Sequence, residues 1–308
     1  MKILVTGGSG FIGSHLVDTL VAGGHEVVIV DHHQREKKRF PNSAAKLYKL
    51  SFDDPALSEV FISEQPDAVC HLAAQISVTY SVAQPIEDAN RNIINSVRLM
   101  EMARQGGCEH FVFASSGGAI YGDHKLRPTP EVFDAEPLSP YGIAKQTFEY
   151  YVDFYRDKYG MKNGVLRFSN VYGPRQFSGG EASVISIFIN KLLAGQPATI
   201  FGDGSSTRDY LFVTDAVHAL AQALEQSFNE TVNVSSGTEI SVVELWDRLK
   251  RIHGVEHELD FQPERAGEVK CSCLSPQTAK EKLGWRAQFS LDEGLKQTYD
   301  WFKAEKQD

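Results

Sequence analysis

The segment MKILVTGGSGFIGSHL at the start of the chain constrains the fold more than any other stretch of the sequence. Residues 3–6 form a short apolar run typical of a buried strand, and residues 11–21 have the length and pattern of a helix. Gly7, Gly10 and Gly13 recur between them at every third position. Such glycines allow a tight turn, a close approach of the backbone to a bound group, and close packing of helix on sheet. The segment predicts a strand–turn–helix unit at the start of an α/β sheet.

The same alternation of short apolar runs and longer amphipathic stretches continues through the first half of the chain. Continuous apolar strands separated by helices are typical of a parallel sheet covered on both faces. We therefore predict a doubly wound parallel sheet of the Rossmann type. The expected strands are residues 3–6, 27–30, 47–50, 68–72, 111–114 and 164–168, and the expected helices are 11–21, 55–63, 89–104 and 141–159.

The pattern changes after Asn170. Residues 173–183 and the segment FGDGSST are loop-like, and Thr214 and Ser241 are candidate helix caps. We expect a strand at 232–234 and helices at 184–194, near 278–283 and at 291–302. The predicted organisation is a dinucleotide-binding domain with a smaller, interleaved C-terminal α/β substrate domain. The first comprises residues 1–170 and about 209–236, and the second about 171–208 and 237–308.

Composition excludes several classes of function. The net charge of −9 argues against general affinity for nucleic acid, which needs clustered Lys and Arg. No apolar stretch approaches the ~20 residues that span a bilayer, and the N-terminal segment does not have the pattern of a signal peptide. The four cysteines are too few for a disulfide framework, and they lack zinc-site spacing. We expect free thiols, no metal, no membrane partner and a cytoplasmic location.

The glycine turn and an acidic residue downstream predict a dinucleotide site. The N-terminus of the helix after the turn offers unpaired N–H groups to a pyrophosphate. Asp31 ends the second expected strand, VVIVD. A carboxylate there accepts hydrogen bonds from a ribose 2′-hydroxyl and repels a 2′-phosphate. NAD is therefore favoured over NADP, although the basic loop after Asp31 is a mild argument to the contrary.

Two further segments carry groups suited to acid–base chemistry. The expected strand FVFASS ends in the hydroxyl pair Ser115 and Ser116, and YGIAK places Tyr141 and Lys145 four residues apart, on one face of a helix. A tyrosine hydroxyl, with an ordinary pKa of ~10, is a poor base near neutral pH, but a nearby ammonium favours its phenolate. The trio Ser116, Tyr141 and Lys145 therefore suits proton transfer at an alcohol while hydride moves to or from NAD.

With these motifs the chain resembles the extended short-chain dehydrogenase/reductases that act on nucleotide sugars, the NAD-dependent epimerase/dehydratase family. The resemblance covers nearly the whole chain. The segments that carry it are TGGSGFIGSHL, HLAAQISV, ASSGGAIYG, SPYGIAK, LRFSNVYGPRQ, IFGDGSSTRDY and ERAGEVKCS.

The resemblance implies roles for individual residues. Ser116, Tyr141 and Lys145 match the catalytic trio, with Ser115 an alternative register for the serine. Tyr141 and Lys145 also match cofactor contacts, as do Gly7, Gly10, Phe11, Ile12, Asp31, Leu72, Ala73, Ala74, Gln75 and Asn92. Asn170, Arg208, Arg265 and Glu268 match groups that hold uridine diphosphate, and Ser116 lies on the substrate side. Paired arginines suit a diphosphate because each guanidinium makes two charge-assisted hydrogen bonds.

The expected reaction is a redox-neutral 4-epimerisation that interconverts UDP-glucose and UDP-galactose. Gly117 and Gly118 replace the Asp-Glu pair of the 4,6-dehydratases, so elimination of water lacks its proton donor. A dehydratase, a reductase, a UDP-glucuronate epimerase or decarboxylase, and a non-enzymatic NAD-binding regulator stay open as alternatives, since fold alone does not exclude them. The resemblance also implies a homodimer through the helices at 89–104 and 141–159.

Ser272 bears on the choice of sugar. It lies where some epimerases of the family carry a bulky tyrosine that closes the sugar pocket. A serine leaves room for a 2-acetamido group, which would admit N-acetylated UDP-hexosamines. The alternative is that Ser272 is an ordinary strand residue between Cys271 and Cys273.

Overall fold

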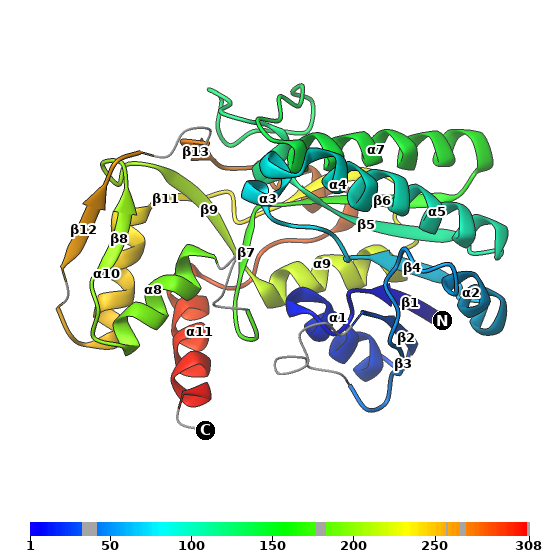
Figure 1. The fold of residues 1–308 in the computed structure, drawn as a ribbon, viewed down its shortest axis with the longest axis horizontal. Coiled ribbons are helices and arrows are strands. Elements are labelled where there is room, and N and C mark those ends of the chain that lie inside the picture. Colours follow the sequence, from blue (N-terminus) through cyan, green and yellow to red (C-terminus); the bar gives the residue numbers. More distant parts are fainter. Residues whose placement is uncertain (33–41, 177–182, 257, 265–268, 307–308) are drawn as a thin grey trace.

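The structure is a computed structural model that describes residues 1–32, 42–176, 183–256, 258–264 and 269–306. Within these residues the elements form two layered regions, a large α/β unit and a smaller one beside it (Figure 1). Arg265 and Glu268, two of the predicted diphosphate-binding residues, lie outside the described part of the chain.

The large unit is built on a seven-stranded sheet in the order β10-β6-β5-β4-β1-β2-β3. All neighbouring strands in it are parallel, which confirms the predicted doubly wound sheet. The order reverses between β1 and β4, and ligands of such sheets bind beyond the carboxyl ends of the strands at this point. The strands are β1 (Lys2–Thr6), β2 (Glu26–Val30), β3 (Lys46–Tyr48), β4 (Ala68–His71), β5 (His110–Ser116), β6 (Lys162–Phe168) and β10 (Thr231–Val234).

Helices cover both faces of this sheet because successive strand residues point to opposite sides. Ile3 and Val5 of β1 pack in one core cluster with Leu16 of α1, whereas Leu4 packs in the other with Phe148 of α7. On one face lie α1 (Phe11–Ala22) and α9 (Val213–Glu225), and on the other α2 (Leu57–Glu64), α5 (Asn95–Gln105) and α7 (Pro140–Tyr159) (Figure 1).

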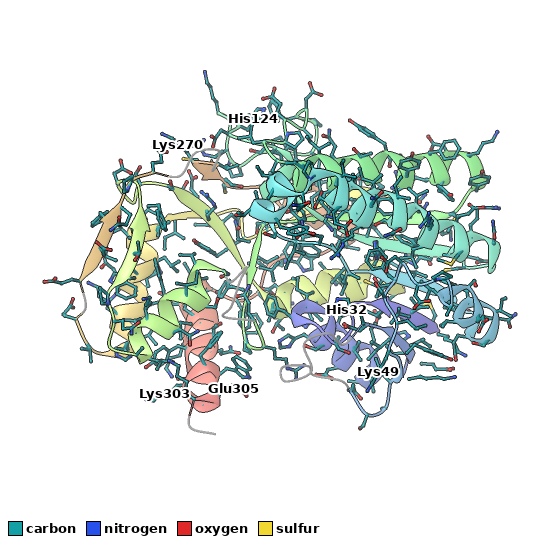
Figure 2. All side chains as sticks on the ribbon, in the orientation of Figure 1. His32, Lys49, His124, Lys270, Lys303 and Glu305 are labelled. Carbon is teal, nitrogen blue, oxygen red and sulfur yellow. The ribbon has the colours of Figure 1, made fainter. Side chains whose placement is uncertain are left out.

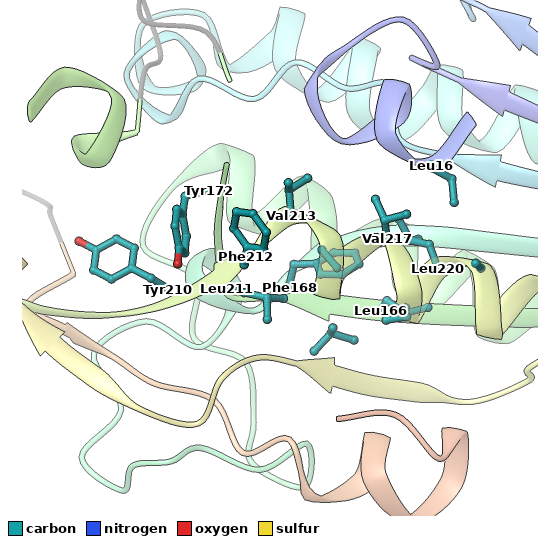
Figure 3. Close-up of a cluster of buried hydrophobic side chains, with 14 of the residues drawn as sticks. Leu16, Leu166, Phe168, Tyr172, Tyr210, Leu211, Phe212, Val213, Val217 and Leu220 are labelled. Carbon is teal, nitrogen blue, oxygen red and sulfur yellow. The ribbon is translucent and has the colours of Figure 1, made fainter. Parts of the chain in front are cut away.

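The core continues from the large unit into the smaller one. Leu166 and Phe168 of β6 lie beside Val217 of α9, and next to them are Tyr210 and Phe212 (Figure 3). Buried aromatic side chains therefore connect the cores of the two units. The residue bounds predicted for two separate domains stay a prediction.

The smaller unit holds the second sheet. Its strand β9 (Thr207–Phe212) pairs in parallel with β7 (Asn170–Tyr172) and β13 (Cys271–Ser272), and antiparallel with β11 (Glu239–Ser241). A separate pair of strands is formed by β8 (Ala198–Phe201) and β12 (Leu259–Gln262). The helices of this unit are α8 (Val184–Leu193), α10 (Val242–His253) and α11 (Leu291–Glu305).

Short elements complete the fold, and several depart from the sequence-based expectations. The helix expected at 89–104 begins earlier, as α4 (Pro85–Ala89), and passes through a π-helical turn, η2 (Asn90–Ile94), before α5. Sequence reasoning missed α3 (Val78–Ala83), α6 (Gly117–Ile120) and the strands β7, β8, β9, β11, β12 and β13. A π-helical turn, η3 (Ala279–Leu283), stands where a helix was expected near 278–283.

The two predicted helix caps have different outcomes. Ser241 accepts a hydrogen bond from the N–H of Glu244, which bonds back in a capping box, so this cap is confirmed. The prediction for Thr214 is wrong, because α9 already begins at Val213, without a side-chain cap. In the first turn of α9, Asp215 accepts hydrogen bonds from the N–H groups of Gln288 and Phe289, which precede α11.

No helix in the described ranges is long and apolar enough to cross a membrane. All four cysteines are free thiols.

Candidate active site

The glycine turn between β1 and α1 has the shape of a dinucleotide cradle. Gly7 has a positive φ of +71°, and its N–H donates to the carbonyl of Val30 over 2.8 Å. A Cβ on Gly13 would lie 2.2 Å from the carbonyl oxygen of Gly7, so no side chain fits there. The first turn of α1 has no side-chain cap at Gly10, which leaves its N–H groups to a phosphate. The residues present therefore fit the predicted cofactor.

The loop after β4 lies directly against this turn. The Thr6 hydroxyl accepts hydrogen bonds from the N–H groups of Leu72 and Ala73, each over 3.2 Å. A Cβ on Gly7 would come within 3.1 Å of the Ala73 nitrogen. Two predicted cofactor segments, 7–13 and 72–75, are thus brought together at the point where the strand order reverses.

Asp31 stands at the carboxyl end of β2, beside the glycine turn. Its side chain is buried, and its Oδ2 accepts a hydrogen bond from the N–H of Ser9 over 3.2 Å. The position is the one predicted for a group that reads the adenosine ribose. The basic residues after Asp31 lie outside the described residues.

We expect Asp31→Ala to weaken NAD binding and to reduce the preference for NAD over NADP, because a 2′-phosphate would no longer meet a carboxylate. Measuring both dissociation constants tests this. Asp31→Asn is the matched control, since its amide oxygen can still accept from Ser9. If the preference for NAD depends on the negative charge of Asp31, both variants should lose that preference. An unchanged ratio of the two constants in both would place cofactor selectivity elsewhere.

Gln75 and Asn92 form a closed polar cluster with a buried carboxylate. Asn92, in the π-helical turn, accepts from the main-chain N–H of Gln75 over 2.9 Å and donates to the Gln75 carbonyl over 2.8 Å. The side chains of Asn92 and Gln75 both donate to Oδ1 of Asp88, over 2.9 and 2.7 Å. A π-helical turn often marks a functional position. Here it aims Asn92 at the loop after β4.

The start of α7 places the Tyr/Lys pair at the end of β5. Ser139 caps the helix by accepting from the N–H of Gly142, and Pro140 occupies its first turn. Lys145 is buried, and its Nζ donates to the carbonyl of Ala114 over 2.9 Å. The same Nζ lies 4.6 Å from the ring centre of Phe113 and 5.9 Å from that of Tyr141. The structure therefore brings the predicted pair together at the carboxyl edge of the sheet.

Electrostatics around Lys145 follow from its burial. Burial lowers the pKa of Lys145 to about 8, and the carboxylates of Glu149 and Asp88 counteract that shift. His71 lies nearby, where burial and the Lys145 charge lower its pKa to about 3. His71 is thus neutral, and its ring bonds to Thr6 and Ser96. At neutral pH the cation beside Tyr141 is Lys145.

The two candidate serines at the end of β5 have different surroundings. Ser115 is buried and donates its hydroxyl hydrogen to Glu149, which also forms an ion pair with Arg167 over 2.6 Å. Ser116 is only half-buried, and it ends β5 as the residue that precedes α6. The hydroxyl hydrogen of Ser115 is thus taken up by Glu149, whereas the side chain of Ser116 is partly open to solvent.

The predicted substrate residues gather around β9. The amide of Asn170 donates to the carbonyl of Asp209 over 3.3 Å, and Arg208 donates to the carbonyls of Thr207 and Lys270. Ser272 pairs with Arg208 across β13 and β9. Side chains of directly paired residues lie on one face of a sheet. Ser272 therefore shares a face with Arg208.

The segment before β13 is tied to the loop that follows β5 and α6. The N–H groups of Lys270 and Cys271 both donate to Oδ1 of Asp123. Lys270 and the neighbouring His124 lie at the same edge of the molecule (Figure 2). This contact fixes the chain where it enters β13, the strand that carries Ser272.

Gly117 and Gly118 differ in the space around them. A Cβ on Gly117 would lie 2.3 Å from a methyl of Leu274, whereas a Cβ on Gly118 would have its nearest neighbour, the Asn170 amide, at 3.8 Å. An acidic side chain at Gly117 could not enter without moving Leu274. Neither position carries the dehydratase acid–base pair, and the first is the more tightly packed of the two.

Sequence reasoning missed three charged residues of the site, Asp88, Glu149 and Arg167. Glu149 could have been found, because Tyr141, Lys145 and Glu149 recur at every fourth residue along one helix face. Arg167 and Asp88 carry no comparable local signal, since their partners lie on other elements.

Comparison with known proteins places this geometry in a family. The sequence profile of the NAD dependent epimerase/dehydratase family matches residues 3–235. The UDP-glucose 4-epimerase of Mycolicibacterium smegmatis is 41% identical over 313 residues, covering 100% of both chains.

Two solved structures extend the likeness to three dimensions. The UDP-glucose 4-epimerase of Thermotoga maritima with UDP-glucose has a TM-score of 0.96 at 45% identity, over 99% of each chain. That of Thermus thermophilus in complex with NAD has a TM-score of 0.93 at 37% identity, over 98% of this chain and 99% of that one.

Proposed function

Because this chain belongs to the NAD-dependent epimerase/dehydratase family, we propose that it is a UDP-glucose 4-epimerase, an NAD-dependent isomerase. The observation that carries the proposal is that Tyr141 and Lys145 lie at the same carboxyl edge of the sheet as the glycine turn. The chain also resembles UDP-glucose 4-epimerases over its full length. The substrate proposed is UDP-glucose or UDP-galactose.

Each residue of the site has a proposed part in the reaction. NAD, when bound, supplies a hydride acceptor and then donor for C4 of the sugar. The Tyr141 oxygen removes the proton of the C4 hydroxyl and later returns a proton to the same C4 oxygen, once the sugar has turned so that hydride would add to the other face of C4. Lys145 stabilises the phenolate by its charge, and Ser116 orients the C4 oxygen. Arg208, with Arg265, holds the diphosphate, so that the sugar can turn about a fixed anchor.

The proposed function is tested by incubating the purified protein with UDP-galactose, with no added NAD, and separating the products. An epimerase converts UDP-galactose to UDP-glucose over many turnovers without net formation of NADH. A net dehydrogenase or reductase would stop when its cofactor is used up, and a dehydratase would release a 4-keto-6-deoxy sugar. No turnover would favour a regulator.

Sugar specificity is proposed to depend on Ser272. Since Ser272 shares a sheet face with Arg208, its side chain lies on the side proposed to bind the nucleotide sugar. We expect Ser272→Tyr to depress epimerisation of UDP-N-acetylgalactosamine far more than that of UDP-galactose, because overpacking costs ~1–3 kcal/mol. The ratio of the two kcat/KM values measures this. Ser272→Ala, which keeps the space open, should leave that ratio in place. A ratio that stays the same in Ser272→Tyr would contradict the proposal that Ser272 sets the sugar specificity.

The assembly proposed is a homodimer formed through α4, η2 and α7. These helices expose large apolar side chains to solvent in the single chain, namely Ile86, Ile94, Ile143, Tyr150 and Phe154. Contiguous exposed apolar surface is typical of an interface between subunits. Light scattering of the purified protein would measure the assembly, and a monomer would contradict the proposal.

We further propose a cytoplasmic location, which suits free thiols and an NAD-dependent reaction.

A further inference from the structure

Asp88 is a buried carboxylate beside the proposed active site. It lies on α4, its side chain is 0% exposed, and its Oδ1 accepts from Gln75 and Asn92. Its other oxygen, Oδ2, is also buried and has no hydrogen-bond partner among the described residues. Burying a carboxylate is costly unless a cation or donors compensate for its charge. The side-chain amides of Gln75 and Asn92 donate to Oδ1 alone. The charge of the carboxylate therefore calls for a nearby cation.

The candidate for that cation is Lys145, whose charge acts on Asp88. Helix α7 packs against both α4 and η2, and the charges of Asp88 and Lys145 act on each other. Lys145 is itself buried, and its Nζ donates to a neutral carbonyl, that of Ala114. Each of these two buried charges thus lies in the field of the other.

The second carboxylate near Lys145, that of Glu149, has a cation of its own. Arg167 contacts both of its oxygens, at 2.6 Å for Oε2 and 3.2 Å for Oε1, and Ser115 donates to it as well. Much of the Glu149 charge is therefore balanced by Arg167. Within the described part of the chain no Lys or Arg forms an ion pair with Asp88. The negative charge of Asp88 is therefore available to balance the positive charge of Lys145.

We propose that Asp88 is a positioning residue that balances the charge of Lys145 and thereby sets the pH range over which Tyr141 exchanges its proton with the substrate. The proposal rests on the catalytic roles proposed above for Tyr141 and Lys145. Its second part is mechanical, since Oδ1 of Asp88 also holds the Gln75–Asn92 pair in place beside the cofactor cradle.

The sign of the effect follows from charge alone. Burial raises the pKa of Asp88, while Gln75, Asn92 and Lys145 act against that rise and favour its ionised form. Besides Asp88, the titratable and charged groups around Lys145 are Tyr141 and Glu149 on α7, His71 on β4 and Arg167 on β6. Removing one negative charge makes every neighbouring proton easier to lose. The protons of Lys145 and of Tyr141 would therefore both leave at lower pH.

The test is the pH dependence of kcat/KM for UDP-galactose in Asp88→Asn. The asparagine keeps an oxygen for Gln75 and Asn92 but removes the charge. The profile of kcat/KM against pH should have an acidic limb, where activity rises with pH, and an alkaline limb, where it falls. We expect both limbs to move to lower pH by about one pH unit, which is the usual scale for the effect of a neighbouring charge on a pKa. At pH values above the new alkaline limb, the variant should be about tenfold less active for each pH unit by which that limb has moved.

Two controls separate charge from structure. Glu87→Gln removes a negative charge from the next residue, but that side chain is exposed and paired with Arg91 at 2.8 Å, so both limbs should stay in place. Asn92→Ala removes a donor to Asp88 without changing charge, so it should lower kcat/KM with both limbs in place. Thermal unfolding and NAD content would be measured for every variant.

Limbs unmoved in an active Asp88→Asn enzyme would overturn the proposal. If the asparagine variant does not fold, Asp88→Ser tests the same charge, and failure of both variants to fold would assign Asp88 a structural role and overturn it too. Absence of epimerisation by the unsubstituted protein would instead count against the proposed function. The two failures are therefore distinguishable.

Discussion

Tyr141→Phe should lose nearly all epimerase activity while it binds NAD and UDP almost as the unsubstituted protein does. The substitution removes only the phenolic oxygen, which is the group proposed to take the proton from the C4 hydroxyl. General acid–base catalysis typically contributes ~10²–10⁴-fold, and we expect a loss of that size in kcat. Turnover of UDP-galactose and the dissociation constants of NAD and UDP are the measurements.

A second tyrosine of the same helix provides the control for that variant. Tyr151 lies on α7, partly exposed, and Tyr151→Phe removes the same oxygen away from the site. Its activity should match that of the unsubstituted protein. If Tyr141→Phe retained full activity, another group would have to be the base, and the proposed mechanism would fail.

Lys145→Ala should be similarly severe, with a different dependence on pH. Without the ammonium the phenolate of Tyr141 is less favoured, so the activity that remains should rise as the pH is raised. In the unsubstituted protein, burial holds the pKa of Lys145 down at about 8. Its charge is therefore present below that value and is lost as the pH rises through it. The measurement is kcat as a function of pH for both proteins.

The control for the lysine is Lys158→Ala, which removes an exposed lysine from the end of the same helix. It should leave both the activity and its pH profile as they are. A Lys145→Ala variant whose residual activity followed the profile of the unsubstituted protein would argue against an electrostatic role. Thermal unfolding should show a loss of stability as well, because Asp88 would then be buried without the cation that balances its charge.

The cofactor half of the protein could be predicted from the sequence because its signals are local. The glycine spacing of residues 7–13, Asp31 at a strand end and the Tyr141–Lys145 spacing each lie within one short segment. The apolar strands of the large sheet could also be predicted from the sequence, since strands buried on both faces are continuous apolar runs. The family was predicted from these motifs and is confirmed by the match over residues 3–235.

The smaller sheet could not be predicted in the same way. Strands β7 and β9 pair through Asn170 and Tyr210, which are far apart in the sequence, and β13 has only two residues. Short strands of this kind carry little periodicity, so tertiary pairing decides whether they form. The predicted cap at Thr214 was wrong because α9 begins one residue earlier, at Val213, and its first turn contacts the distant segment before α11 through Asp215.

The sequence by itself determined the type of sheet, the cofactor turn and the Tyr141–Lys145 pair, because these depend on residue types at fixed local spacing. Only the tertiary structure decided which charges surround that pair. Asp88 reaches it from α4 and Arg167 acts through Glu149 from β6, along contacts between elements that no local pattern records. The physical reason is burial. A charge withdrawn from water is governed by the groups packed against it, and packing brings together residues that the chain keeps apart.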